Sequence, residues 1–426
     1  MSVELDHLHK IAESPDDDEP RLEYAEFLED RGDYRAELVR LQCQREKLDW
    51  WEREFVPIND RINTLVQKYQ DDLQERLVKW PNLKMQVERG VPTIIDLGWG
   101  ERRFEDWDEI KANFPTVNSI VVHGHPDFVS TCASRLEGIK RLALTYAVSS
   151  YSFSRLLDAE WFRELDYLKF QVNHYNDSPA WFSDTSCLSQ LQRLSVDVGH
   201  WSDEFVAGLM DCQLPELQTL ILKATNDESF GNDIDEAIVQ NDSLRKLRKL
   251  RISRGGLKNI SALSDPTSRL KLESLCVKGW SLNGNPIDAF ESFVSSPNCR
   301  NLRELKIEYG RCSDEFCAAL SQSKYVSQLH YLGLQGNSVR PEGAQMLANA
   351  SVLRPRALDL SWDPIARGVA NLAESSLLEE LMWADFSCCE IDDEGLEQFL
   401  QRVTAPKLHD LDLGGTNYLL TVRRPH

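Results

Sequence analysis

The sequence lacks any uninterrupted apolar run of about 18–20 residues, the length that a membrane-spanning helix needs. Its first ten residues, MSVELDHLHK, show none of the apolar core of a secretory signal. Positive charge is in short supply, because 48 lysines and arginines stand against 69 aspartates and glutamates, for a net charge of −21. We therefore expect a cytoplasmic protein that coats neither nucleic acid nor a membrane surface.

Cysteine pairs of the zinc-binding kind are missing as well. The ten cysteines include no Cys-x-x-Cys, and the closest groupings are Cys312 with Cys317 and the adjacent Cys388 and Cys389. Structural zinc sites need two close ligand pairs, so no such site is predicted. We expect most of these thiols to be small core residues in a reducing compartment.

Recognisable catalytic motifs are also absent. The glycine doublets at 255–256 and 414–415 belong to no phosphate-binding loop, and no G-x-S-x-G turn occurs. Two weaker patterns are His123-x-His125 followed by Asp127, and the acidic run at residues 16–19. We interpret the first as loop polarity rather than a metal site, and the second as helix capping rather than calcium binding. The expectation is a protein without cofactor, metal or catalytic residues.

What the sequence has in abundance is one apolar pattern, with apolar residues at positions i, i+3 and i+5. It starts at residues 139, 165, 191, 217, 247, 272, 302, 329, 355, 378 and 408, with 117 as an earlier member. From 139 to 408 the starts lie 23 to 30 residues apart, a regularity that random leucine clustering does not produce. The last five triplets are Leu302-Leu305-Ile307, Leu329-Leu332-Leu334, Leu358-Leu360 after Pro355, Leu378-Leu381-Trp383 and Leu408-Leu411-Leu413.

Each apolar triplet alternates like a strand, and the residues that follow are spaced like a helix. The segments SDEFCAALSQ (313–322), RPEGAQMLANA (340–350) and DDEGLEQFLQ (392–401) are predicted helices with acidic or proline starts. One strand–helix unit cannot enclose a core, so each must stack on its neighbours. The pattern predicts a curved parallel sheet with helices on the outside.

The repeats resemble leucine-rich repeats of the ribonuclease-inhibitor type over about residues 91–420. The resemblance implies an α/β leucine-rich-repeat solenoid, a curved parallel sheet with outer helices. That family places a hydrogen-bonding side chain eight residues after each start. Asn173, Asn337 and Asp363 fit this position, whereas Gly310 and Phe386 do not.

The first ninety residues lack the repeat pattern and are predicted to be helical. Pro20 is expected in the first turn of one helix, Gly32 at its end, and Asp33 as the cap of the next. A further helix is predicted from about Pro57 to Lys79. We expect a small all-α N-terminal domain at residues 1–85, followed at residues 86–426 by about 11–12 repeats, including irregular end repeats.

This helical stretch resembles the repeat-companion domain that precedes repeats in many bacterial proteins, chiefly from planctomycetes. The resemblance implies an association with repeat arrays and no established activity. Glu26 and Phe27 replace the usual Asp and Trp of the family pattern. The residues in register are Pro15, Asp16, Asp17, Arg21, Leu22, Tyr24, Ala25, Leu28, Glu29, Gly32, Asp33, Arg35, Ala36, Glu37 and Gln42.

The inner face of the predicted sheet carries the candidate binding residues. Positions i+2, i+4 and i+6 alternate with the core positions, so they line the concave surface. In the later repeats these positions are mostly acidic: Glu304, Glu308, Asp359, Glu380, Asp410 and Asp412, with Lys306 as the exception. In the middle repeats they are mostly basic, namely Lys169, Arg193, Lys223, Lys249, Arg251 and Lys278, diluted by Asp197. Apolar or aromatic residues at these positions are Tyr167, Ile221, Tyr331 and Met382. The predicted partner-binding residues are the six cations together with Tyr167 and Tyr331.

We therefore expect a non-enzymatic protein-interaction scaffold that binds a protein partner, through an acidic segment, on the concave face. Two alternatives stay open. Some ribonuclease-inhibitor-type repeat proteins stimulate GTP hydrolysis, so the resemblance also allows a GTPase-activating or other regulatory role. The second alternative is an adaptor whose N-terminal helices hold a second partner.

Overall fold

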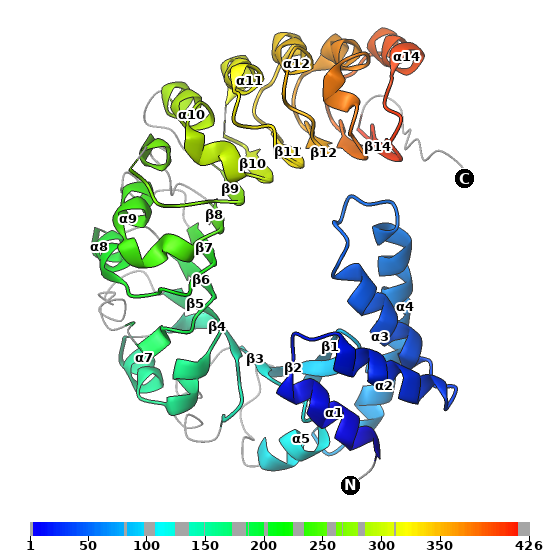
Figure 1. Cartoon of the computed structure of the whole chain (residues 1–426), viewed down its shortest axis with the longest axis vertical. Helices are drawn as coiled ribbons and strands as arrows, with labels where there is room; N and C mark the ends of the chain where they lie inside the picture. The colour runs from blue at the N-terminus through cyan, green and yellow to red at the C-terminus, as the bar shows by residue number, and fades with distance from the viewer. Residues whose placement is uncertain are drawn as a thin grey trace. The chain divides into compact units, whose positions relative to one another are not determined.

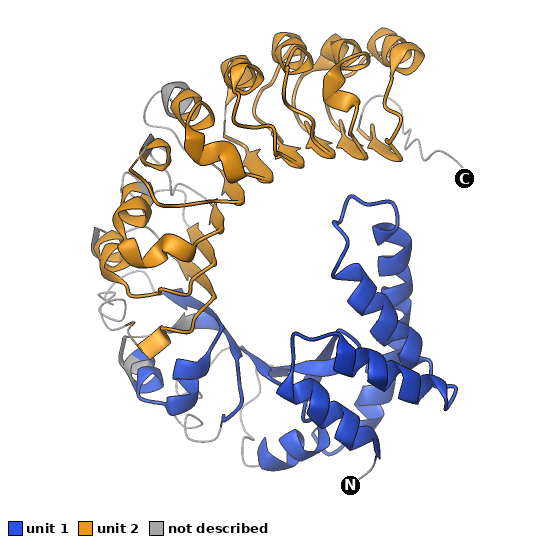
Figure 2. Cartoon of the chain, viewed as in Figure 1, with its two compact units in different colours: residues 1–173 blue, residues 174–426 orange. Residues whose placement is uncertain are grey.

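The computed structural model describes two compact units, residues 1–173 and 174–426 (Figure 2). The border between them lies inside the predicted repeat region, and the predicted domain border after residue 85 stays a prediction. The described residues are 3–80, 83–97, 107–123, 136–148, 150–172, 185, 187–199, 203–224, 234–253, 261–265, 267–279, 286–310 and 312–415.

The first unit begins with four helices: α1 (Val3–Glu13), α2 (Glu19–Glu29), α3 (Arg35–Arg45) and α4 (Phe55–Arg76). The last three were predicted, and Gly32 ends α2 in the left-handed conformation, with φ of +66°. Asp33 accepts a hydrogen bond from the backbone N–H of Arg35, as expected for a helix start. Helix α1 was not predicted, because only Leu8 and Ile11 mark its buried face.

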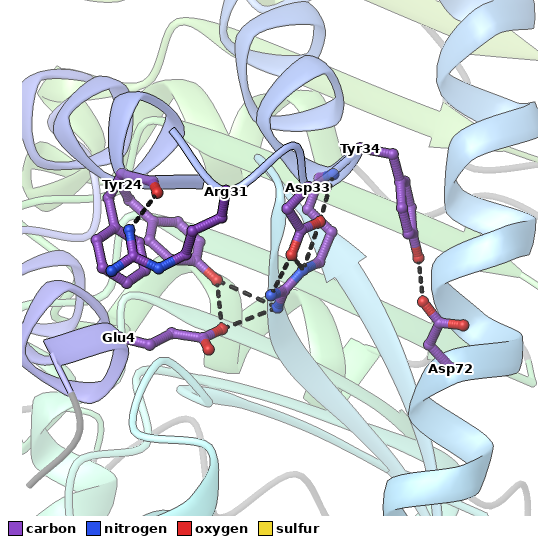
Figure 3. Close-up of polar contacts among 8 residues, drawn as sticks. Glu4, Tyr24, Arg31, Asp33, Tyr34 and Asp72 are labelled. Carbon is purple, nitrogen blue, oxygen red and sulfur yellow. Dashed lines mark hydrogen bonds and ion pairs between the residues drawn. The ribbon is translucent and has the colours of Figure 1, made fainter. Parts of the chain in front are cut away.

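Polar contacts tie these helices together (Figure 3). Arg35 donates to Glu4 at 2.9 Å, and Tyr24 donates to the same carboxylate oxygen at 2.9 Å. Tyr34 donates to Asp72 on α4. Helices α1, α2 and α3 therefore meet at the part-buried guanidinium of Arg35, and the Tyr34 hydroxyl links the start of α3 to α4.

A β-hairpin follows the helices and connects them to the repeats. Its strands, β1 (Leu83–Glu88) and β2 (Val91–Leu97), are antiparallel, unlike the parallel pairing predicted for the sheet. The backbone N–H of Gly90 at the tip donates to Gln42, and Arg89 donates to Asp18. Val91 belongs to the same apolar cluster as the helices. The hairpin tip is therefore part of the helical core.

The rest of the first unit contains the first parallel repeats. Strands β2 to β5 pair in parallel in sequence order. The elements are α5 (Trp107–Asn113), β3 (Ser119–Val122), β4 (Arg141–Val148), α7 (Ser150–Leu157), the 3-10 helix η1 (Glu160–Glu164) and β5 (Tyr167–Val172).

The second unit is a regular array of strand–turn–helix units. All its strands pair in parallel with the next, on the inner side of an arc whose outer side is covered by helices (Figure 1). The strands are β6 (Arg193–Val198), β7 (Thr219–Ala224), β8 (Lys249–Ser253), β9 (Ser274–Lys278), β10 (Glu304–Glu308), β11 (Tyr331–Gly333), β12 (Ala357–Asp359), β13 (Trp383–Asp385) and β14 (Asp410–Asp412).

The helices predicted from sequence are confirmed as α11 (Ser313–Gln322), α12 (Pro341–Ala348) and α14 (Asp393–Arg402). The other α-helices of this unit are α8 (Asp203–Asp211), α9 (Ile234–Gln240), α10 (Pro286–Val294) and α13 (Val369–Leu372). Its 3-10 helices are η3 (Asp242–Lys246), η4 (Ser261–Ser264), η5 (Pro297–Asn301), η6 (Ala366–Gly368) and η7 (Ser376–Leu378).

The apolar rows form the core between strands and helices, as the repeat pattern predicted. Leu305, Leu332 and Leu358 pair laterally on successive strands, and none has exposed area. Asn337 fills the predicted hydrogen-bonding position. Its amide donates to the carbonyls of Ile307 and Leu334, both at 2.6 Å, and its oxygen accepts from the N–H of Gly310 at 2.8 Å. One side chain thus bridges two repeats.

One predicted triplet, Leu378-Leu381-Trp383, is wrong by three residues. Ala384 pairs with Leu358 and with Leu411, so the core positions of this repeat are Leu381, Ala384 and Phe386. Ala384 is small and only weakly apolar, so the sequence pattern assigned the triplet from the more apolar Leu378 instead. The corrected starts at 355, 381 and 408 are more evenly spaced than the predicted ones.

The register shift also corrects three position assignments. Phe386 is a core residue without exposed area, and Cys389 takes the hydrogen-bonding position, with its Sγ 2.9 Å from the carbonyl oxygen of Leu360. Glu380 and Met382 leave the inner face, because the strand is Trp383–Asp385. Trp383 and Asp385 replace them there.

Candidate inner-face binding site

The inner-face residues of the second unit lie where period-two alternation places them. In β8, Leu250 and Ile252 are each 1% exposed and point into the core, whereas Lys249 and Arg251 are exposed. The strand register extends this arrangement to the neighbouring strands, because Lys249 pairs with Thr219, which pairs with Arg193. Lys223 is exposed at the end of β7.

These four cations form what we call the basic patch: Arg193, Lys223, Lys249 and Arg251. Among the described residues, no carboxylate lies within ion-pair distance of Lys223, Lys249 or Arg251. Nearby cations outside the strands behave differently, since Lys246 on η3 binds Glu216 at 2.6 Å. Lys223, Lys249 and Arg251 therefore present positive charge that no ion pair within the described part of the chain neutralises.

Lys278, predicted as part of the same site, is neutralised instead. Its Nζ lies 2.9 Å from Glu308, and Lys306 approaches the other oxygen of that carboxylate at 2.6 Å. Burial by itself would raise the pKa of Glu308, but the bonds from Lys306 and Lys278 outweigh it and lower this pKa. We call Lys278, Lys306 and Glu308 the ion-pair cluster.

Tyr331 is on the inner face as predicted, but only 6% of it is exposed. Lys306 lies 5.7 Å from the centre of its ring, and burial raises the pKa of its hydroxyl. Tyr331 therefore belongs to the floor of the face and offers little surface to a partner. Tyr167 and Lys169 lie on β5 of the first unit, and their part in a site stays a prediction.

Carboxylates occupy the far end of the inner face. Asp359 pairs with Asp385, and Asp385 with Asp412, so three aspartates lie side by side on β12, β13 and β14. We call these three the acidic row. Asp359 and Asp412 were predicted on this face, but Asp385 was missed because of the misplaced triplet.

The weaker candidate patterns resolve into local contacts where the structure describes them. His123 binds Asp96 at 3.0 Å and Thr145 at 2.8 Å, whereas His125 and Asp127 lie outside the described residues. Burial by itself would raise the pKa of Asp18 in the acidic run, but Lys47 and Arg89 bring it to about 2.

Metal-binding clusters and membrane-spanning helices are both lacking in the described ranges. No group of three or more His, Cys, Asp or Glu residues there is placed to hold a metal ion. In those ranges no helix has the length and apolar character needed to cross a bilayer. The cysteines described are free, and burial raises the pKa of most of them, for example Cys212 to about 12.

One family model matches a short part of the repeat region. The leucine-rich-repeat family model matches residues 385–400, which run from the end of β13 into α14. The fold is a leucine-rich-repeat solenoid with a small N-terminal helical region. A comparison with curated protein sequences finds no match.

Two solved structures are similar to the solenoid at low sequence identity. One is the yeast Rad7 and Elc1 complex, with a TM-score of 0.49 and 13% identity over 87% of this chain and 94% of the other. The second is a protein from Bacteroides fragilis, with a TM-score of 0.40 and 13% identity over 86% of each chain.

Two exposed aromatic residues near the inner face escaped the sequence analysis. Tyr309 is 43% exposed and Trp362 is 60% exposed. Each lies seven residues after the start of its repeat and directly precedes the hydrogen-bonding position. The signal was available, since a large aromatic at this position contrasts with glycine in neighbouring repeats, namely Gly336 and Gly415.

Proposed function

We propose that the protein is a protein-interaction scaffold whose basic patch binds an acidic segment of a partner. The observation that supports this most directly is the exposed, unneutralised trio of Lys223, Lys249 and Arg251 in a chain of net charge −21. Strands hold the trio in a fixed arrangement, which reduces the entropy lost on binding.

A protein segment suits this face better than nucleic acid does. A continuous phosphate backbone laid along the sheet would meet the acidic row a few strands beyond the basic patch. Such repulsion opposes the counterion-release gain on which nucleic-acid binding depends. An acidic peptide segment can end before the aspartates begin.

Charge reversal tests the proposal. Fluorescently labelled acidic peptide is titrated into the wild-type protein and the Lys249→Glu/Arg251→Glu variant, with association rates measured across a range of salt concentrations. Wild type should bind faster at low salt, and the variant should bind about tenfold or more slowly with a flatter salt dependence.

The matched control is Arg245→Glu/Lys246→Glu, which makes the same change in net charge on exposed residues of η3. The control should bind like wild type if position on the inner face matters. Equal association of wild type and the strand variant would end the proposal, and equal losses in both variants would assign the effect to overall charge.

A further inference from the structure

The inner face of the second unit is sorted by charge along its length. Cations predominate on β6 to β8, where Asp197 is an inner-face carboxylate beside Lys223; the ion-pair cluster and Glu304 occupy β9 and β10, and carboxylates occupy β12 to β14. The ion-pair cluster is internally balanced except for one surplus lysine, so it separates the two charged ends. One surface thus carries both signs in separate places.

Asp385 and Asp412 are part-exposed whereas Asp359 is buried, and the acidic row has no counter-ion in the described part of the chain. Adjacent parallel strands are about 4.8 Å apart, so Asp359, Asp385 and Asp412 are within range of mutual repulsion. Burial raises the pKa of Asp385, and the charges of Asp359 and Asp412 raise it further. The free protein therefore carries a destabilising arrangement at this end.

The local turns explain why a side-chain oxygen acceptor is present at each of these positions, but they do not explain why that side chain is charged. One oxygen of Asp359, Asp385 and Asp412 accepts a hydrogen bond from the backbone N–H two residues later, at 3.0, 2.8 and 2.7 Å. Asparagine makes the same turn without charge. Three charged residues in one lateral row therefore exceed what the turns require.

Aromatic side chains lie beside the acidic end. Trp383 is an inner-face residue of β13, and Trp362 exposes 60% of its surface just after β12. Trp362 has a φ of +62°, where Gly336 occupies the corresponding position of the preceding repeat and Gly415 that of a later one. Trp383 is part-buried and Trp362 is exposed. An exposed indole ring next to carboxylates suits lysine and arginine side chains, which combine ion pairing with cation–π contact.

We infer that the second unit recognises one extended, charge-segregated segment of a partner protein, with its acidic part on the basic patch and a lysine- or arginine-rich part on the acidic row. The inference rests on the proposed function for the acidic part and extends it at the opposite end. From β8 to β13 are five strand spacings, about 24 Å, which about seven extended residues span.

Three labelled peptides test this in binding titrations with the full chain. The first is an acidic block alone. The second, the block peptide, joins this acidic block through about seven Gly/Ser residues to a Lys/Arg block. The third has the composition of the second with its charges alternating. Wild type should bind the block peptide about tenfold more tightly than either other peptide, because the second contact becomes intramolecular.

The variant that isolates the acidic row is Asp385→Asn/Asp412→Asn, which keeps both turn acceptors. It should lose the advantage of the block peptide and still bind the acidic block like wild type. It should also melt at a higher temperature than wild type, because like-charge repulsion is relieved. A matched change on an exposed outer pair, Glu394→Gln/Glu397→Gln, should leave the block preference intact.

The outcomes separate the two proposals. If the acidic block binds but the cationic block adds nothing, the further inference is wrong and the proposed function stands. If the joined block peptide binds wild type and not the aspartate variant while the acidic block alone fails to bind, the proposed function is wrong. Equal binding of block and alternating peptides, or unchanged binding by the aspartate variant, overturns charge-segregated recognition.

Discussion

Gly90 shows how much a single residue determines in the N-terminal region. Its φ is +85°, and a Cβ at this position would lie 2.6 Å from the Cα of Val39. The hairpin tip can therefore approach α3 only because the side chain is hydrogen. Both the backbone conformation and the packing exclude other residues.

We expect Gly90→Ala to lower the free energy of unfolding by about 2–4 kcal/mol, from left-handed strain plus overpacking. Gly32→Ala is the matched control, since Gly32 has a φ of +66° and nothing within 4 Å of the added Cβ. Gly32→Ala should lower the free energy of unfolding by only about 1 kcal/mol. Urea unfolding of both variants measures the difference, and equal losses would show that packing against Val39 contributes nothing.

Asp363 is the residue with the largest expected effect of pH. Burial is the main reason that its pKa rises from 3.8 to about 8, while the backbone N–H of Val339 donates to its Oδ1 at 3.0 Å. The folded state therefore binds one proton more than the unfolded state between about pH 4 and pH 8.

Because the folded pKa is the higher one, the contribution of Asp363 to stability should decline as pH rises through that window, by up to about 1.4 kcal/mol per pH unit. Asp363→Asn keeps the acceptor and removes the titration. Urea unfolding at pH 5, 6, 7 and 8 should show that the difference in free energy of unfolding between wild type and variant changes with pH. Parallel curves would contradict the raised pKa.

At the scale of the element, helix α12 obtains its N-terminal cap from the neighbouring repeat. The N-cap residue of α12, Arg340, makes no capping bond with its own side chain. Asp314 on α11 supplies the acceptor instead, for the N–H groups of Arg340 at 2.8 Å and Gly343 at 3.1 Å. This explains why local sequence rules for helix starts found α12 from its proline and not from a cap.

We expect Asp314→Ala to lower the free energy of unfolding by about 1–2 kcal/mol, because two helix-terminal N–H groups lose their acceptor. Asp314→Asn should cost clearly less, since its amide oxygen can still accept. Chemical denaturation followed by circular dichroism compares the two. Identical losses would attribute the effect to the charge of Asp314 rather than to capping.

For the whole molecule, the structure makes the N-terminal helices and the first hairpin one cooperative group. Val91 of β2 shares an apolar cluster with Leu28, which is 1% exposed. Helices that served only as a flexible appendage would not share their core with the first strands. This bears on the adaptor alternative, because removing residues 1–85 would also damage the start of the sheet.

Leu28→Ala should therefore lower hydrogen-exchange protection in α1 to α3 and at residue 91 together, with a loss of about 2–5 kcal/mol. Protection in β10 to β12 should persist. The matched variant Leu358→Ala, at a position without exposed area, should have the opposite distribution. Loss confined to the helices, with residue 91 unaffected, would show that the hairpin is independent of them.

The sequence alone determined the repeat architecture, because apolar residues at i, i+3 and i+5 every 23 to 30 residues bury one strand face only when units stack. Where the triplet was placed correctly, it also determined which side of the strand faces inward, since alternation is a local property; on β13 the misplaced triplet reversed the two faces. Tertiary structure decided the rest. The lateral register placed Asp385 beside Asp359, Glu308 neutralised Lys278, and the hairpin tip docked on α3. These contacts join residues roughly one repeat or more apart, and local residue patterns carry no information about such distant partners.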